Sequence, residues 1–308
     1  ENANNFKVDA SRDISYVQFN ITATAEDENA IKAGLTELIA DFKTTSNDAE
    51  FLSENDSDIN LDDNFKFESQ VNSGIASKLF KGAKGEVFGP YKDQNYLKLS
   101  KITEVTQIPD SARASHILIP FVGSQRVAPE VTRTEEEAKK TADSILNLVK
   151  RNKDKFDDIA KTMSSDKGSG AKGGDLDWFS YSTMTPTFRD YVFQNDKGDI
   201  DVVKSPFGYH IIRIDGQKNK QRALKLATFG SQIVASEATE NAVFQKAEQF
   251  ALATSKDKKF FEIAKENNYV TKPVVGLKVL DENVPGLGNQ RQIISWAFGK
   301  DTNAGDFK

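Results

Sequence analysis

The chain repeats one local pattern three times, and this repeat constrains its fold more than any other feature of the sequence. Each copy begins with a short segment in which apolar side chains alternate with others, which is typical of a strand with one buried face. These segments cover residues 16–21, 115–119 and 224–229. Each is followed by a stretch whose apolar residues recur at helical spacing. The repeat therefore predicts three units that share a β-α-α-β-β order.

The helix signal is clearest in the second unit. Thr134 followed by Glu137 is a capping-box pattern, in which the two side chains satisfy free N–H groups at the start of a helix. The apolar face that follows would consist of Ala138, Ala142, Ile145, Leu146 and Val149. We therefore expect an amphipathic helix directly after this cap.

Short polar segments at 103–113 and 215–222 separate the units. They predict domains at residues 1–105, 112–217 and 222–308, and the last one reaches the end of the sequence before its final strand should appear. Some hinge motion between such domains is expected.

Composition removes several classes of function. The 308 residues include no cysteine, which excludes disulfides, thiolate catalysis and zinc–thiolate sites. Two histidines are too few for a three-histidine metal centre, so we expect neither a metal nor a cofactor. The net charge of −5 argues against a nucleic-acid partner, because such proteins usually present a basic domain or stripe.

Targeting signals are also missing from the sequence. No stretch approaches the ~20 apolar residues of a membrane span. The first residue is Glu1, and no charged segment followed by an apolar one precedes the repeat. We expect a fragment of a longer chain, whose parent can still carry a membrane anchor or a secretion signal.

Candidate functional side chains are concentrated in the middle unit. Both histidines, His116 and His210, lie there, and each leads into an aliphatic strand. Neighbouring strands would bring them together in a small sheet, either as a functional pair or as hydrogen-bonded core histidines. The glycine-rich stretch 164–179 matches neither common phosphate-binding motif, so we interpret it as a loop that shapes a pocket. Met184 and Phe188 are spaced for one face of a helix start and fit either a pocket wall or a core.

Taken together, residues 114–216 resemble the parvulin family of peptidyl-prolyl cis-trans isomerases. The motifs that carry the resemblance are Ser115-His116-Ile117-Leu118, Gly173-Gly174-Asp175-Leu176, Met184-x-Pro186-x-Phe188, Val192-Phe193 and Phe207-Gly208-Tyr209-His210-Ile211-Ile212. Their order and their spacing both agree with the family. The resemblance implies an α+β fold in which a four-stranded antiparallel sheet is flanked by helices.

The resemblance also implies a role for each matching residue. His116 and His210 correspond to the paired central histidines of the family, and Asp166 to the residue that faces the isomerising bond. Ser205 corresponds to a hydroxyl residue in the same hydrogen-bond network. The walls of the proline pocket correspond to Leu176, Met184 and Phe188, with Phe179 close by.

The sequence departs from the family at the rim of this pocket. Asp177 stands where a glycine is usual, and Lys167 stands where a proline often follows the aspartate. The segment 120–132 after the first strand is long and would form part of a substrate-binding lip. These departures are expected to affect rate and sequence preference more than fold.

The outer units lack the histidine pair. Gln18 and Lys225 occupy the position of the first histidine, and Leu97 occupies that of the second. We therefore expect degenerate parvulin-like modules on both sides of the middle one, which bind chain or pack on their neighbours. Tandem modules of this kind resemble bacterial envelope foldases of the PpiD- and SurA-like group. The resemblance implies a location in the bacterial periplasm or cell envelope. It is compatible with an inner-membrane anchor in the full-length protein.

The leading hypothesis is a peptidyl-prolyl isomerase that acts on X-Pro bonds of unfolded or newly exported polypeptides and assists their folding. The alternative is a non-catalytic chaperone whose three modules hold unfolded chains by weak multivalent contact. A hydrolase is disfavoured, because nothing in the sequence resembles an activated nucleophile.

Overall fold

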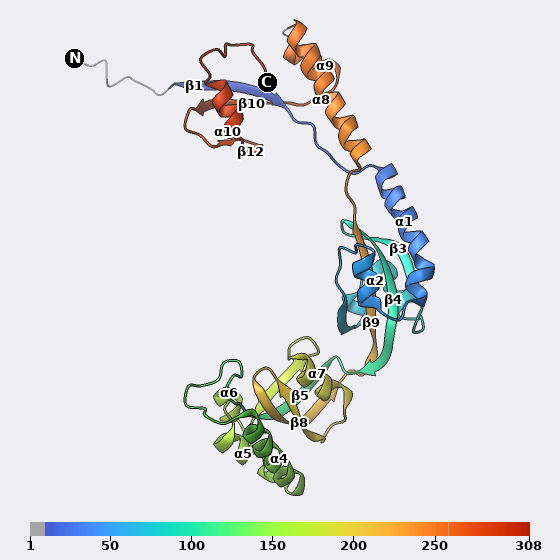
Figure 1. Ribbon diagram of the computed structural model, residues 1–308, viewed down its shortest axis with the longest axis vertical. Coiled ribbons are helices and arrows are strands. Elements are labelled where there is room, and N and C mark those ends of the chain that lie inside the picture. Colours follow the sequence, from blue (N-terminus) through green and yellow to red (C-terminus); the bar gives the residue numbers. More distant parts are fainter. Residues whose placement is uncertain (1–9, 258) are drawn as a thin grey trace, which may run out of the picture. The chain divides into compact units, whose positions relative to one another are not determined.

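The computed structural model describes residues 10–257 and 259–308 and shows an α+β protein (Figure 1). The chain forms two compact units. One runs from Leu35 to Ser231, and the other combines the described residues up to Gly34 with Gln232–Lys308. None of the helices in the described ranges has both the length and the apolar character that crossing a bilayer requires.

The middle of the chain folds into a four-stranded antiparallel sheet with the strand order β6-β5-β8-β7. The strands are β5 (Ser111–Ile119), β6 (Asp175–Ser180), β7 (Ile200–Ser205) and β8 (Gly208–Lys218). The helices are α4 (Glu135–Arg151), η3 (Lys153–Lys155), α5 (Phe156–Met163), α6 (Lys167–Gly170) and α7 (Pro186–Gln194). This is the antiparallel sheet with flanking helices that the resemblance implies.

Two hydrophobic clusters cover the two faces of this sheet. Helices α4 and α5 pack on one face, in a cluster of Ile117, Ile119, Ala138, Ala142, Ile145, Val149, Phe156, Ala160, Ile200, Tyr209 and Ile211. On the other face, Ala112, Ala114 and Ile212 pack with residues of α7. Successive side chains of a strand point to opposite faces. His116 and His210 therefore share the face of α7.

The start of α4 shows the capping box that the sequence predicts. The Thr134 hydroxyl accepts a hydrogen bond from the Glu137 N–H at 3.2 Å, and the Glu137 carboxylate accepts one from the Thr134 N–H at 2.8 Å. The expected apolar face is buried, except that Leu146 is only partly covered. The local signals at this helix were therefore sufficient to place it.

A second four-stranded sheet in the same unit has the strand order β2-β9-β4-β3. Its strands are β2 (Asp62–Lys66), β3 (Val87–Asp93), β4 (Tyr96–Ile108) and β9 (Gln221–Gln232), accompanied by α2 (Asp48–Glu54), η2 (Glu68–Gln70) and α3 (Ser73–Leu79). Short connections join β4 to β5 and β8 to β9. The middle sheet is thus inserted between two strands of the second sheet (Figure 1).

The other unit contains an antiparallel pair of strands, β1 (Ser11–Val17) and β10 (Thr271–Lys278). Its further elements are α8 (Glu237–Asp257), α9 (Phe260–Glu266), β11 (Asn283–Val284), β12 (Gly288–Asn289) and α10 (Arg291–Ala297), and α1 (Ala25–Thr44) begins in it. A small core of Val274, Leu277, Val284 and Ile294 holds the strand pair against α10.

The strand pairing differs from the expected row of three modules in two places. The repeat assigns β9, which contains Lys225, to the third module, but β9 pairs with β2 of the first. The repeat assigns β1 to the first module, but β1 pairs with β10, and Gln18 lies just beyond its end. A strand bonds to whichever edge lies beside it in space, so a local pattern does not identify its partner. In place of three consecutive modules, the described residues form the middle sheet, a composite second sheet and two short two-stranded sheets.

Candidate active site

Strand register brings the two histidines together. In the β5–β8 pair, His116 lies opposite Ile212, and Leu118 lies opposite His210. The Nδ1 atoms of the two imidazoles are 3.0 Å apart, and the ring planes are inclined by only 16°. Both side chains are buried. The two residues therefore form a hydrogen-bonded pair at the centre of the sheet.

Asp166 reaches this pair from the loop between α5 and α6. The loop is held to the end of β5, because the Leu118 N–H donates to the Ser164 hydroxyl at 3.1 Å and the Ser165 N–H donates to the Leu118 carbonyl at 2.9 Å. The Asp166 Oδ2 atom lies 2.8 Å from His116 Nε2. This hydrogen bond, more than any other contact, holds the pKa of Asp166 well below its usual range. Asp166 is therefore an anion beside the histidines.

Ser169 completes this end of the site and was missed by the sequence reasoning. Its hydroxyl donates to Asp166 Oδ2 at 2.5 Å and lies 3.0 Å from His116 Nε2. The signal that could have found it is the spacing of Asp166 and Ser169, which resembles the N-cap and N3 positions of a short helix. Asp166 is indeed the N-cap of α6, accepting from the Gly168 N–H at 3.0 Å.

Ser205 lies at the other end of the pair. Its hydroxyl is 2.6 Å from His210 Nε2 and accepts a hydrogen bond from the Phe207 N–H at 3.1 Å. Burial, followed by the charge of neighbouring His116, lowers the pKa of His210 to about 3. His210 is therefore neutral at ordinary pH.

These contacts fix the direction of hydrogen bonding when both imidazoles are neutral. The Asp166 carboxylate accepts from His116 Nε2, so His116 Nδ1 is an acceptor. His210 Nδ1 donates to that atom, and His210 Nε2 accepts from the Ser205 hydroxyl. The assignment follows from the partners of each nitrogen. The result is one continuous chain of hydrogen bonds from Ser205 to Asp166.

The glycine pair 173–174 allows the loop to run directly against β5. Gly174 has a φ of +88°, and a Cβ atom there would lie 2.4 Å from the carbonyl oxygen of His116. The Gly174 carbonyl accepts from the His116 N–H at 2.9 Å. Asp177, at the position of a family glycine, has a φ of +59°, a left-handed conformation that Asp adopts more readily than most residues. The departure at Asp177 therefore preserves the backbone that a glycine would take.

The residues expected to form the proline pocket gather on the same face. Leu176 and Phe179 come from β6, Met184 from the turn before α7, and Phe188 from α7 itself. Phe188 is only 3% exposed, and its ring meets His116 and His210 edge-to-face at 5.7 and 5.4 Å between centroids. Leu176 and Met184 are partly buried against the same cluster. An apolar wall thus adjoins the histidine pair.

The expected lip, residues 120–132, is attached beside Ser205. The Gln125 N–H donates to the Pro206 carbonyl at 2.8 Å, and the Arg126 guanidinium lies 5.9 Å from the centre of the Phe207 ring. Lys167, the second departure from the family, donates from its ammonium group to the Ser164 carbonyl at 3.1 Å. The lip and Lys167 therefore lie at the two ends of the hydrogen-bond chain.

The arrangement suits binding and electrostatic chemistry. The Ser205 hydroxyl belongs to a residue that is only 6% exposed and is engaged on both sides, so it is not presented to a substrate as a nucleophile. Among the described residues, no group of three or more histidine or acidic side chains could hold a metal ion. The site offers a carboxylate, a hydrogen-bonded pair of imidazoles and an apolar wall.

Comparison with known proteins relates this region to curated proteins. Residues 97–218 match the family model described as the PPIC-type PPIASE domain. The chain is 32% identical to the chaperone SurA of Pseudomonas fluorescens over 113 residues, which are 36% of this chain and 24% of that protein. It is 37% identical to the foldase protein PrsA of Staphylococcus aureus over 116 residues, which are 37% of this chain and 36% of that protein.

The search of solved structures also gives a match to this region. The crystal structure of the peptidylprolyl isomerase PrsA from Bacillus anthracis matches with 25% identity and a TM-score of 0.30, over 52% of this chain and 61% of that one. The chain spans well under half the length of the curated relatives named above. The family assignment rests on the sequence matches, and the region covered by the family model contains both histidines, Asp166 and the apolar wall. Over residues 97–218, the chain therefore contains a PPIC-type peptidyl-prolyl isomerase domain of the parvulin family.

Proposed function

We propose that the middle domain, residues 112–217, catalyses cis–trans isomerisation of X-Pro bonds in unfolded or newly exported polypeptides. The observation that carries the proposal is the hydrogen-bond chain from Ser205 through His210 and His116 to Asp166, next to the apolar wall that contains Phe188. Such a site combines a grip for a proline ring with a fixed charge distribution.

The reaction requires a twisted amide and no broken bond. Rotation about the peptide C–N bond meets a barrier of ~18–20 kcal/mol, which makes uncatalysed X-Pro isomerisation slow. In the twisted state, resonance is lost, the nitrogen becomes more basic and the carbonyl more ketone-like. A site lowers the barrier when it binds this state more tightly than either planar isomer.

Each group of residues has a separate part in this proposal. Leu176, Met184 and Phe188, with Phe179 behind them, hold the proline ring and exclude water. The Asp166 carboxylate lies beside the substrate carbonyl and acts through electrostatics. His116 and His210, fixed by Ser205, keep the pocket in shape. The mechanism is non-covalent and uses no cofactor.

The substrates follow from the relatives and the charge. The matching proteins are named as a chaperone and a foldase, which supports polypeptide substrates and a role in protein folding. The net charge of −5 supports a partner other than nucleic acid. We propose that the protein works in the bacterial periplasm or cell envelope, and this location is compatible with an inner-membrane anchor in the full-length protein.

A second candidate function is chain holding without catalysis. The unit that contains α8, α9 and β10 exposes several large apolar side chains, among them Val275 at 78% and Leu280 at 83%. Exposed apolar groups of this size can bind the apolar segments of an unfolded chain. This surface supports a chaperone activity that would exist beside isomerisation or in place of it.

Exchange NMR on a short Ala-Xaa-Pro peptide tests the proposal. The intact protein should accelerate cis–trans exchange, and a protein carrying His116→Ala and Asp166→Ala should not. Asp158→Ala is the matched control, because Asp158 lies on α5 with its side chain 81% exposed and should leave the rate unchanged. If the intact protein accelerates exchange for no residue Xaa, the isomerase proposal fails. Met184→Ala separates the two candidate functions. If the domain is an isomerase, this variant should lose the acceleration of exchange and still suppress the aggregation of an unfolded client protein.

A further inference from the structure

We propose that Arg189 is a positioning residue, which holds the pocket wall in place by tying α7 to strand β2 of the second sheet. The inference rests on the proposed function, because Phe188 is assigned there to the proline pocket. Arg189 directly follows Phe188 in α7. Phe188 contacts the histidines, whereas Arg189 contacts β2. The two neighbouring residues thus connect the site to a different sheet.

The Arg189 side chain is buried, although it carries a charge. It is 6% exposed, and its Nε donates to Asp190 Oδ1 at 2.8 Å. Its Nη1 donates to the Oδ1 atom of Asn64, and its guanidinium lies 4.4 Å from the centre of the Tyr181 ring. A buried guanidinium is strongly unfavourable unless its N–H groups have partners. These three contacts therefore determine where the side chain can lie.

The partner on β2, Asn64, is an exposed residue of the second sheet. Asn64 lies in the irregular stretch of β2 between its two paired positions, Asp62 opposite Leu226 and Lys66 opposite Leu224. The Asn64 N–H donates to Asp62 Oδ1 at 3.0 Å. Asn64 belongs to the second sheet and not to the matched family region of residues 97–218. Its hydrogen bond to Arg189 therefore joins α7 to a strand outside the matched region.

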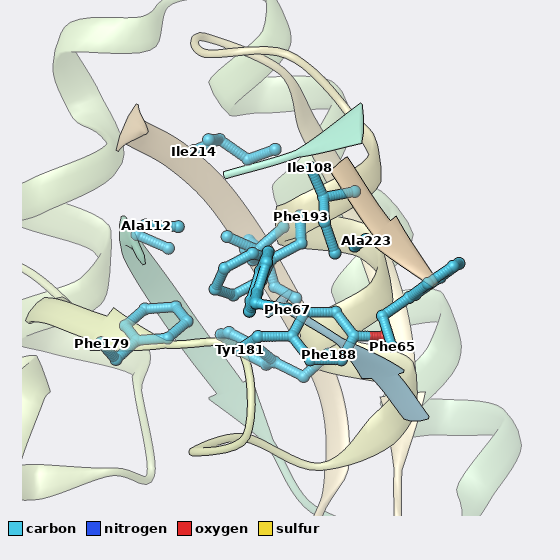
Figure 2. Close-up of a cluster of buried hydrophobic side chains, with 13 residues drawn as sticks. Phe65, Phe67, Ile108, Ala112, Phe179, Tyr181, Phe188, Phe193, Ile214 and Ala223 are labelled. Carbon is cyan, nitrogen blue, oxygen red and sulfur yellow. The ribbon is translucent and has the colours of Figure 1, made fainter. Parts of the chain in front are cut away.

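A row of aromatic contacts follows the same route through the core (Figure 2). The Phe65 ring lies 6.0 Å from Tyr181, Tyr181 lies 5.1 Å from Phe193, and Phe193 lies 5.9 Å from Phe179. Phe179 in turn lies 6.4 Å from Phe188. All five rings belong to one buried cluster. A displacement of α7 against β2 would therefore move Phe188 relative to the histidines.

The position of the Arg189–Asn64 hydrogen bond predicts whether its loss changes KM or kcat. Losing the Asn64 oxygen leaves a buried N–H of Arg189 without its acceptor, so α7 must adjust. The hydrogen-bond chain from Ser205 to Asp166 does not contact Arg189 and stays intact. The pocket that grips the proline ring changes, while the charges around the twisted amide do not. Binding of the X-Pro peptide should weaken more than turnover.

The test compares single-residue variants of the whole 308-residue chain. Asn64→Ala removes the acceptor, and Arg189→Met removes the donor with little loss of volume. Asn72→Ala is the matched control. Asn72 caps α3, which accompanies the same sheet, by accepting from the Gly74 N–H, and it donates to Asp93; both partners lie outside α7. KM and kcat for an X-Pro peptide are measured together with the imidazole signals of the two histidines by NMR. The edge-to-face contacts of Phe188 make those signals sensitive to its position.

Asn64→Ala and Arg189→Met should each raise KM roughly three- to tenfold with a smaller change in kcat, less than misplacing a catalytic group costs. Both should shift the histidine signals, and the double variant should shift them no further than Arg189→Met alone. Asn72→Ala should leave the signals unchanged. Unshifted histidine signals in folded Asn64→Ala would overturn the inference. If Arg189→Met does not fold, Asn64→Ala decides the question. If the intact protein shows no isomerase activity, the proposed function fails, and the histidine signals still test the positioning role.

Discussion

His210 gives a prediction about stability that can be worked out from the structure. Burial, together with the neighbouring charge of His116, lowers its pKa to about 3, and Asp166 opposes this shift only partly. Its neighbours are His116, Ser205 and the ring of Phe188, and none of them offers an anion in direct contact. A proton on His210 would therefore be poorly stabilised in the folded protein.

The sign and size of the effect follow from proton linkage. An unfolded chain binds a proton at His210 below a pKa of ~6.5, whereas the folded protein does not bind it until the pH approaches 3. The unfolded state therefore holds more protons between these values, and the free energy of unfolding falls as the pH falls through this window. Between pH 7 and pH 5 the loss is 2.303RT multiplied by about 1.5 pH units, or about 2 kcal/mol.

Urea unfolding of the intact chain at pH 7 and pH 5 measures this loss. Tryptophan fluorescence reports on the middle sheet when Trp296→Phe is used as the background, because Trp178 lies in β6 and Trp296 lies in α10 of the other unit. The same experiment with His210→Gln removes the contribution of His210 and leaves that of the carboxylates. The wild-type protein should lose about 2 kcal/mol more than the variant between the two pH values.

Two results would refute this reasoning. A pH dependence of stability that is identical in the wild type and in His210→Gln would mean that His210 titrates equally in both states. An imidazole NMR signal of His210 that titrates with a midpoint near pH 6.5 in the folded protein would show directly that folding does not lower the pKa of His210. The folded protein should instead keep this signal constant from pH 8 to pH 5.

Three further predictions concern the supports of the site. Ser205→Ala removes the hydroxyl that is hydrogen-bonded to His210 Nε2 and should lower stability by about 1–3 kcal/mol in the same urea assay, because a buried nitrogen is left unpaired. Gly174→Ala should destabilise the middle sheet by more than about 2 kcal/mol and abolish prolyl exchange, since its Cβ would lie 2.4 Å from the His116 carbonyl oxygen; a thermal midpoint equal to that of the wild type would contradict this. Thr134→Ala should cost about 1 kcal/mol through loss of the N-cap of α4 and leave exchange unchanged.

The sequence could predict those parts of the fold that depend on local chemistry. The capping box at Thr134 and Glu137 places α4, and alternation along β5 and β8 places His116 and His210 on one face. Asp166 and Ser205, which the resemblance singles out, lie at the two ends of the histidine pair. These features arise within a few residues of each motif or from the pairing of two adjacent strands.

Features that depend on distant partners could not be predicted in this way. Nothing local in β9 indicates that it pairs with β2 and not with a strand that follows it. The same holds for β1, whose partner β10 lies near the other end of the chain. Nothing in the residues around Arg189 indicates that it is buried against Asn64, which the composite second sheet brings to it. Repeated local patterns describe strands and helices but leave open which strand edges meet.

The chemistry of isomerisation explains why these distant contacts matter for function. No bond is formed or broken, so the rate depends on how closely the pocket fits one twisted state of the substrate. In the proposed mechanism this fit depends on the position of Phe188, which packs within the aromatic cluster as part of α7. Because Phe65 and Asn64 contribute to this packing from the second sheet, substitutions there can change the pocket without touching the histidines or Asp166. The second sheet is therefore part of what shapes the site, although it lacks the histidine pair.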